Sequence, residues 1–310
     1  MPRATKKTGS TAAIWRLAVP ASSANLGPGF DALALALDFG LRIEARLGAP
    51  RDRLVWSGEG AGELALDRRN LLLRGLAAGR AHWGEGESLA IHASSAIPIG
   101  RGLGSSAAAV VAGLALSALS AGRRPQPQEL LELGSRLEGH ADNIAAALLG
   151  GLALVARDGA TWRAVRLPID RRLGLLLAIP NRRLDTAAAR ALLPKRVPLG
   201  AAVSNLQRFG LLLTALARGR AGTLRPALED ELHQPFRMAQ VPELKELLEL
   251  RCERLLGVCL SGAGPTVLAF VRGPAPEVEA QMRKVLARHG GGRVRRCRPA
   301  ARGLRFRRVA

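Results

Sequence analysis

Several residue types are scarce in this 310-residue sequence, and each scarcity argues against a class of protein. Tyrosine is absent, aromatic residues make up 3% of the chain, and no nucleic-acid-binding motif is found. No apolar run approaches the ~20 residues that a membrane-spanning helix needs. The three cysteines, Cys252, Cys259 and Cys297, form neither a metal-ligand pattern nor an even disulfide set. We therefore expect a cytoplasmic protein that acts neither on a specific nucleic acid nor in a membrane.

Acidic residues are also few, with 25 against 46 lysines and arginines, so the formal net charge is +21. Part of this excess lies in residues 293–310, which carry many arginines and no acid. Such a charge favours polyanions of any kind, including nucleotides and nucleic acids. Without a nucleic-acid motif we interpret it as a solvated basic surface. A non-catalytic, basic nucleic-acid-binding protein remains an alternative.

The length of the chain exceeds what one hydrophobic core needs and suits two lobes. Hydrophobic residues make up 48% and charged residues 23%, as in ordinary globular proteins. Near the start, Arg3, Lys6 and Lys7 precede an apolar run that faintly resembles a secretion signal. Arg16 interrupts that run, so we expect a first strand over 14–20 instead.

Residues 98–113, PIGRGLGSSAAAVVAG, are the most informative stretch. A strand-like apolar run ends at Pro98, glycines recur at alternate positions, and small helix formers follow. The pattern predicts a strand, a glycine loop and a helix whose first N–H groups face an anion, typically phosphate. Two better-known loops are excluded, because there is no lysine for a P-loop and Ser105 occupies the third glycine position of the dinucleotide fingerprint. The alternative is a glycine turn that leads into a buried helix.

A second informative stretch, ASSANLGPGFDALALALD, begins at Ala21. Asn25 to Gly29 predict a turn, and the apolar run over 30–37 is interpreted as a buried helix. Asp31 could simply cap that helix, since carboxylates favour a first turn. Alternatively, Asn25 and Asp31 point into a pocket and hold an ammonium or hydroxyl group.

Further along, three segments combine polar side chains with helical patterns. EGHADNIAAALLGG places His140, Asp142 and Asn143 at a helix start. In PNRRLDTAAARALLP, Thr186 and Arg190 lie one turn apart on the same helix face. EDELHQPFR contains Arg237, and two arginines can clamp a carboxylate through paired hydrogen bonds.

The remaining pattern predicts an alternation of strands and helices. Strands are expected over 41–47, 54–57, 152–156, 162–167, 173–179, 256–260 and 267–271. Helices are expected over 70–83, 103–119, 128–137 and 275–288, with Asn70 as an N-cap and the basic tail returning as a strand. The loop LSGAGPT joins the strands 256–260 and 267–271.

Taken in order, these stretches resemble the three motifs of the GHMP kinases, and the resemblance covers nearly the whole chain. The stretch that begins at Ala21, the first of the three along the chain, is similar to the form found in the homoserine kinases of that family. The resemblance implies an α+β fold of two lobes, a ribosomal-protein-like lobe over 1–170 and a ferredoxin-like lobe over 171–310, with a boundary near 168–172. It further implies Mg²⁺-dependent transfer of the γ-phosphoryl group of ATP to the hydroxyl of L-homoserine. Another small-molecule kinase of the family remains the alternative enzyme.

The resemblance also implies roles for individual residues. Asn25 and Asp31 would hold the substrate ammonium, Arg190 and Arg237 its carboxylate with Thr186 nearby, and Asn143 with His140 would orient its hydroxyl. Mg²⁺ would bind Ser106 and Glu132, the acid eight residues before His140, rather than Glu138. ATP would bind Asn70, Pro98, Ile99, Gly100, Arg101, Gly102, Leu103, Gly104, Ser105, Ser106, Ala107, Gly262 and Gly264. Phe236 stands where the family usually has tyrosine, and a homodimer is possible.

Overall fold

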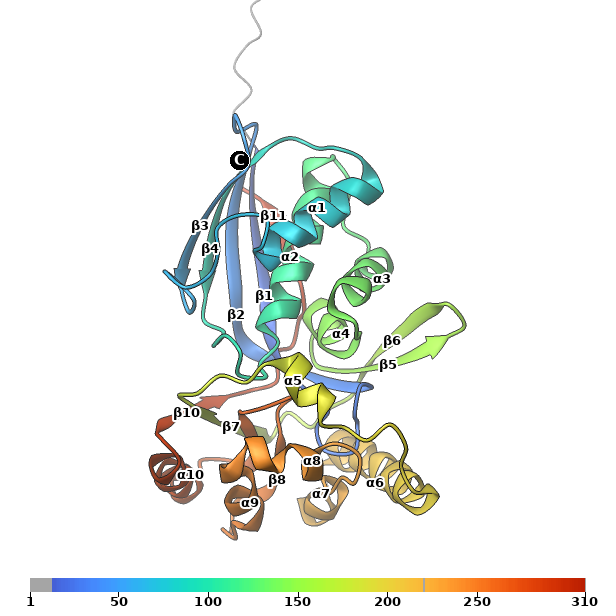
Figure 1. Ribbon diagram of the computed structural model, residues 1–310, viewed down its shortest axis with the longest axis vertical. Coiled ribbons are helices and arrows are strands. Elements are labelled where there is room, and N and C mark those ends of the chain that lie inside the picture. Colours follow the sequence, from blue (N-terminus) through green and yellow to red (C-terminus); the bar gives the residue numbers. More distant parts are fainter. Residues whose placement is uncertain (1–12, 220, 310) are drawn as a thin grey trace, which may run out of the picture.

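The computed structural model describes residues 13–219 and 221–309, which form two β-sheets with helices packed against each (Figure 1). Arg3, Lys6 and Lys7, weighed above as part of a secretion signal, lie outside the described residues. Within the described residues, no helix is both long enough and apolar enough to cross a bilayer. The expected two-lobed α+β organisation is confirmed.

The first sheet has seven strands and contains both ends of the described chain. Its main path runs β11–β1–β2–β4–β3, while β5 pairs with β2 and with β6. Only β3 and β4 pair in parallel among these strands. The strands are β1 (Ile14–Ala24), β2 (Leu33–Leu47), β3 (Arg53–Gly58), β4 (Leu89–Ser95), β5 (Leu152–Asp158), β6 (Thr161–Leu167) and β11 (Arg305–Arg308).

Four helices cover one face of this sheet: α1 (Leu71–Trp83), α2 (Ser105–Ser120), α3 (Pro127–Glu138) and α4 (Asp142–Leu149) (Figure 1). Helix α2 is buried from Ala107 to Ser120, because its small side chains allow close packing on all sides. A Cβ atom at Gly113 would come within 1.9 Å of the Leu72 carbonyl oxygen on α1. The close approach fixes α2, and with it the position of the loop that precedes it.

The second sheet has four antiparallel strands in the order β10–β7–β9–β8. They are β7 (Leu173–Pro180), β8 (Leu255–Leu260), β9 (Val267–Arg272) and β10 (Gly292–Cys297). The helices of this lobe are α5 (Thr186–Ala191), α6 (Leu199–Arg218), α7 (Ala221–Ala227), α8 (Gln234–Arg237), α9 (Pro242–Glu249) and α10 (Pro276–Arg288), with a 3-10 turn η1 (Met238–Gln240). Short α5 lies at the junction of the two lobes (Figure 1).

The chain passes from one sheet to the other between β6 and β7, where the boundary near 168–172 was expected. The last strand then returns: Trp15 of β1 is paired with Arg308 of β11. The first sheet therefore takes an edge strand from the C-terminal end of the chain, and β10 and β11 confirm that the basic tail returns as strands.

The helix expected over 30–37 is wrong, because β2 begins at Leu33. Residues 33–37 are fully buried, since the strand pairs with β1 on one side and with β5 on the other. A short, continuously apolar run is compatible with a helix or with a buried strand, so periodicity could not distinguish them. The expected turn at 25–29 is present, and Asn25, Leu26 and Asp31 adopt positive φ.

Candidate active site

A pocket of about 370 Å³ lies where the two lobes meet. Its wall draws on the glycine loop, the Asn25–Asp31 turn, the start of α4, helix α5 and the 262–263 turn. Almost every predicted site residue therefore reaches one cavity. The exceptions are Glu132 and Gly264, neither of which lines it.

The glycine loop has the backbone conformation that its sequence predicts. Gly100, Gly102 and Gly104 have φ of 63°, 69° and 69°, in the left-handed region that side chains disfavour. Gly104 is the N-cap of α2, and Ser105 and Ser106 at the helix start line the pocket. The first N–H groups of a helix have no partner within it, and they carry the positive end of its dipole. This end of the pocket is therefore suited to an anion.

The 261–266 turn of the second lobe holds the glycine loop from behind. Ser261 Oγ donates to the Gly102 carbonyl at 2.7 Å, and the Thr266 N–H donates to the Arg101 carbonyl at 3.3 Å. A Cβ atom at Gly102 would lie 2.2 Å from the Ser261 carbonyl oxygen and 2.8 Å from that of Gly264. Gly264 thus supports the loop without reaching the pocket.

The acid beside Ser106 is Glu138, whereas Glu132, the acid predicted to bind the metal, does not line the pocket. Ser106 Oγ donates to Glu138 Oε1, and both residues line the pocket. Glu132 lies earlier on α3, where its Oε1 accepts the Trp162 N–H of β6 at 2.6 Å. Spacing from His140 pointed to Glu132, but the last turn of α3 is the part that reaches the pocket.

A hydroxyl and a carboxylate are the hard oxygen ligands that Mg²⁺ prefers, so the Ser106–Glu138 pair fits that ion. Among residues 13–219 and 221–309, no group of three or more His, Cys, Asp or Glu side chains could hold a metal. An ion bound here would take its other ligands from phosphate oxygens and water, as Mg²⁺ commonly does.

The start of α4 brings three polar groups to the centre of the pocket. Asp142 Oδ1 faces His140 Nδ1 at 3.0 Å and accepts the Asn143 N–H at 2.7 Å. Burial of His140 opposes its charge, but the hydrogen bond and the charge of Asp142 outweigh it and raise the histidine pKa. Asn143 Oδ1 accepts a hydrogen bond from Ser22 Oγ at 2.7 Å, which fixes the orientation of the amide. Asp142 Oδ1 thus accepts a hydrogen bond from His140 Nδ1 and favours the charged form of the imidazole.

The opposite end of the pocket contains an ion pair between two predicted substrate-binding residues. Arg190 Nη2 donates to Asp31 at 2.6 and 2.9 Å, and the two side chains are 44% and 37% exposed. Asn25 Oδ1 accepts the Asp31 N–H at 3.1 Å, and Asn25 Nδ2 donates to the Gly262 carbonyl at 3.0 Å. Two of the charges expected to bind a zwitterion are thus brought together and pair with each other.

Arg237 is the buried member of this group. It is 2% exposed, and its Nη1 donates to the Gly262 carbonyl at 3.1 Å. Phe30 lies between the two arginines, with each guanidinium 5.5 Å from its ring centre. Burial and then the charge of Arg190 lower the Arg237 pKa, while Asp31 counters them. A carboxylate would compensate this concentration of positive charge.

Asn70 caps α1 as expected: its Oδ1 accepts the Leu72 N–H at 3.0 Å. It also lines the pocket, next to apolar residues that the sequence did not single out, among them Trp56 and Leu64. These come from β3 and the loop after it. Their hydrophobicity was visible in the sequence, but nothing distinguished them from core residues.

A two-lobed α+β fold, with a glycine loop opening a buried helix across from acidic and basic side chains, is the arrangement of a small-molecule kinase. The family model described as the GHMP kinases N terminal domain matches residues 70–151, and that of the GHMP kinases C terminal matches 212–288. The chain belongs to the GHMP kinase family, and curated relatives of known name indicate the branch.

Homoserine kinase of Moorella thermoacetica is 40% identical over 276 residues, covering 88% of this chain and 92% of the relative. Homoserine kinase of Thermus thermophilus is 41% identical over 269 residues, covering 86% and 90%. The crystal structure of homoserine kinase from Cytophaga hutchinsonii matches with a TM-score of 0.85 and 26% identity, over 98% of this chain and 100% of that one. Within the family, the chain is thus one of the homoserine kinases.

Proposed function

We propose that this protein transfers the γ-phosphoryl group of ATP to the side-chain hydroxyl of L-homoserine, giving O-phospho-L-homoserine for threonine biosynthesis. One observation carries the proposal: one pocket is lined both by the glycine loop, which suits an anion, and by an acid with two arginines. A triphosphate fits the first part, the phosphate end, and an amino-acid zwitterion fits the second part, the acceptor end.

At the phosphate end, backbone N–H groups of the loop and of the α2 start face the triphosphate. Phosphoryl transfer needs mainly positioning and charge stabilisation, and pre-oriented backbone dipoles supply both. Trp56, Leu64 and Ile99 offer an apolar wall to the adenine base, beside Asn70. Ser106 and Glu138 would hold Mg²⁺, which when bound neutralises charge on the β- and γ-phosphates.

At the acceptor end, the substrate would replace the Asp31–Arg190 ion pair. Its ammonium would pair with Asp31, beside Asn25, and its carboxylate would pair with Arg190 and Arg237. Asp31 and Arg190 would each exchange one opposite charge for another, so neither would be left without a partner. An acceptor without an ammonium, such as mevalonate, would leave Asp31 without that compensation.

The hydroxyl would then lie near Asn143 and His140, between the two ends. Its oxygen forms a bond to the γ-phosphorus while the bond from that phosphorus to the β–γ bridging oxygen breaks. The hydroxyl proton passes to a phosphoryl oxygen and then to solvent, and ADP leaves. A loose transition state requires little help from a base, so Asn143, with His140 nearby, orients the hydroxyl.

A coupled assay of ADP release with L-homoserine, L-threonine and mevalonate tests the proposal. We expect turnover with homoserine that far exceeds both others. Faster turnover with mevalonate would favour another small-molecule GHMP kinase. No ATP turnover, together with binding to DNA or RNA that weakens steeply with salt, would favour the nucleic-acid-binding alternative.

The remaining expectations concern the cell and the assembly. Cys252, Cys259 and Cys297 are free thiols, which supports the cytoplasmic location that we propose. We also predict that the protein has neither a specific nucleic acid nor a membrane as a partner. A homodimer stays a possible assembly.

A further inference from the structure

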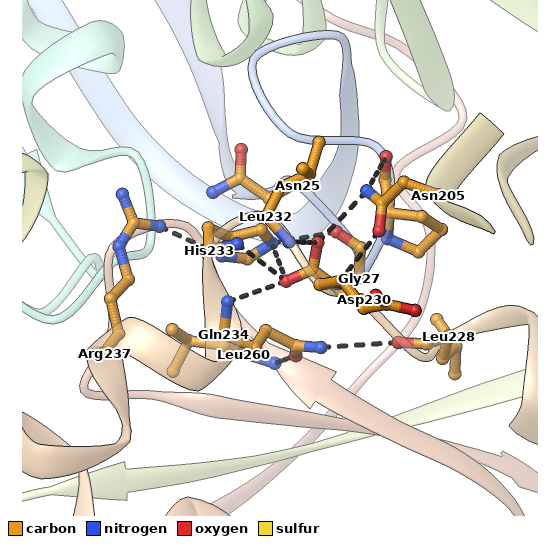
Figure 2. A network of polar contacts seen from close by, with 12 residues as sticks. Asn25, Gly27, Asn205, Leu228, Asp230, Leu232, His233, Gln234, Arg237 and Leu260 are labelled. Atoms are coloured by element: carbon orange, nitrogen blue, oxygen red, sulfur yellow. Dashed lines mark hydrogen bonds and ion pairs between the residues drawn. The ribbon is translucent and has the colours of Figure 1, made fainter. Parts of the chain in front are cut away.

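A buried polar network lies directly behind the proposed acceptor end, and the proposed reaction uses only its last member, Arg237. Figure 2 shows Asp230, His233 and Gln234 packed between the Asn25–Gly27 turn and the second sheet. Resting on the proposed function, we propose that His233 is a positioning residue that aims Arg237 at the carboxylate of the substrate and ties it to the turn that carries the ammonium site.

Asp230 organises the start of α8, the short helix that ends at Arg237. Its Oδ2 accepts the N–H groups of His233 at 3.0 Å and Gln234 at 2.7 Å, while Oδ1 accepts the Leu232 N–H at 3.0 Å. Gln234 Oε1 in turn accepts the Leu260 N–H of β8 at 2.7 Å. The helix has only four residues, about one turn, so buried side chains rather than its own hydrogen bonds fix it to the second sheet.

The protonation state of His233 follows from its two ring partners. Arg237 Nη1 lies 3.1 Å from Nδ1, and a guanidinium can only donate, so Nδ1 accepts and carries no proton. Nε2 lies 2.8 Å from the Gly27 carbonyl, which can only accept, so Nε2 carries the proton. The neutral Nε2–H tautomer satisfies both contacts at once. Complete burial lowers the histidine pKa, although Asp230 Oδ2, 3.5 Å from Nε2, acts in the opposite direction.

One imidazole therefore connects the two halves of the acceptor site. On one side it holds the guanidinium of Arg237; on the other it holds the turn that bears Asn25 and leads to Asp31. Phe30 stacks on the same imidazole, with ring centres 5.3 Å apart and planes inclined by 25°. A Cβ atom at Gly27 would lie 2.3 Å from the Leu228 carbonyl oxygen, so the turn is seated tightly against this network.

Two substitutions separate the contacts of the ring. In His233→Gln, the amide nitrogen can take the place of Nε2 and keep the bond to Gly27, but the acceptor for Arg237 is lost. In His233→Asn, the amide oxygen can take the place of Nδ1 and keep Arg237 oriented, while the reach to Gly27 is lost. We expect only the first substitution to impair recognition of the carboxylate.

The readout is a selectivity ratio: kcat/KM for L-homoserine divided by kcat/KM for 3-aminopropan-1-ol, which has the same ammonium and hydroxyl but no carboxylate. Both values come from one preparation, so a partly unfolded variant affects numerator and denominator equally. Loss of a hydrogen bond to a charged group predicts a fall in this ratio of about tenfold or more for His233→Gln. For His233→Asn the ratio should stay within about threefold of the parent.

Asn205 provides a matched control. It donates to Asp230 Oδ1 at 3.1 Å and to the Pro28 carbonyl at 3.3 Å, from the side of the network away from Arg237. Asn205→Ala should lower the unfolding temperature while leaving the ratio unchanged. Equal falls with both substrates in His233→Gln, or an altered ratio in Asn205→Ala, would overturn the positioning role.

A second measurement does not depend on any variant being active. Nitrogen-15 NMR of the parent histidines, with the His233 signal assigned from its loss in His233→Asn, should show the neutral Nε2–H tautomer. A protonated ring or the Nδ1–H tautomer would overturn the inference. If instead the parent does not phosphorylate L-homoserine at all, the proposed function fails while the tautomer result still stands or falls separately.

Discussion

The two ends of the pocket are built in different ways. The phosphate end is one contiguous stretch, residues 98–107, and it presents mainly backbone groups held by left-handed glycines. The acceptor end is assembled from side chains that lie far apart in the sequence, with Asp31 and Arg190 joined across a separation of 159 residues. Any substitution that bends the backbone should therefore damage the first end, whereas removal of a single charge should damage the second.

This difference has a consequence for the protein without substrate. Backbone N–H groups at a helix start cannot neutralise one another, so the phosphate end stays available to an anion. Side chains of opposite charge can neutralise one another, and Asp31 pairs with Arg190. Arg237 stays fixed by the buried network. We therefore predict that substrate binding at the acceptor end exchanges the partners of Asp31 and Arg190.

The largest effect is expected from removing the fixed charge of the acceptor end. Arg237→Gln should lower kcat/KM for L-homoserine by about 100- to 1,000-fold, as loss of a buried partner of a charge does, and leave KM for ATP within about twofold. Steady-state kinetics measures both constants. The exposed Arg196, in the loop between α5 and α6, is the control when changed to Gln. A loss below tenfold in Arg237→Gln would remove this residue from the clamp.

A matched pair of acids tests the metal assignment at the phosphate end. Glu138→Gln should lower kcat by about 100-fold and raise the Mg²⁺ concentration needed for half-maximal rate, because a carboxylate ligand is lost. Glu132→Gln should change the rate less than about threefold. A Mg²⁺ titration of both variants distinguishes them. The reverse order would restore Glu132 as the ligand and contradict the arrangement described above.

A pair of glycines tests whether the loop depends on close contact or only on left-handed backbone. Gly102 and Gly122 both have φ of 69°, but only Gly102 would bring a Cβ atom against backbone oxygens, while Gly122 faces open space. Both alanine variants should lose about 1 kcal/mol of unfolding free energy from backbone strain, and Gly102→Ala should lose more because its added Cβ clashes with backbone oxygens. Only Gly102→Ala should also raise KM for ATP, by about tenfold, because the loop must move away from Ser261. An unchanged KM would show that the contact is dispensable.

The smallest effect concerns His140, which lies where the two ends meet. Its pKa is raised in the folded protein, chiefly through Asp142 acting against burial. The stabilisation from its protonation is therefore fully present below the unfolded value, 6.5, and is lost as the pH rises through the folded value. The unfolding free energy lost in His140→Gln should thus be larger near about pH 5.5 than near about pH 8.5. Denaturant unfolding of both proteins at these two pH values measures it, and an equal loss would contradict the ion pair.

The conformation of the glycine loop could be predicted because it is encoded locally. Glycines at alternate positions followed by serines and a small-residue helix dictate the loop without knowledge of distant residues, and the loop lies where that reading required. The acceptor residues were reached only through the resemblance to a family, since nothing local marks Arg190 or Arg237 among so many arginines.

The differences between expectation and structure have a common physical origin. Leu33–Leu37 were read as a helix because uniform apolarity has no period, and only pairing with β1 and β5 decides the strand. Glu132 was preferred to Glu138 because counting residues does not show which turn of α3 reaches the pocket. The tautomer of His233 depends on Gly27 and Arg237, whose proximity only the fold reveals.

The most direct measurement compares kcat/KM of the unaltered protein for L-homoserine with the values for two half-substrates, 3-aminopropan-1-ol and 4-hydroxybutanoate. The first lacks the carboxylate and the second lacks the ammonium, so each leaves one part of the acceptor end without its partner. We predict that kcat/KM for each half-substrate is at least about 100-fold lower than kcat/KM for L-homoserine, since each half-substrate loses a charge-paired contact. A rate with either half-substrate that equals the rate with L-homoserine would contradict recognition of the zwitterion by Asp31, Arg190 and Arg237.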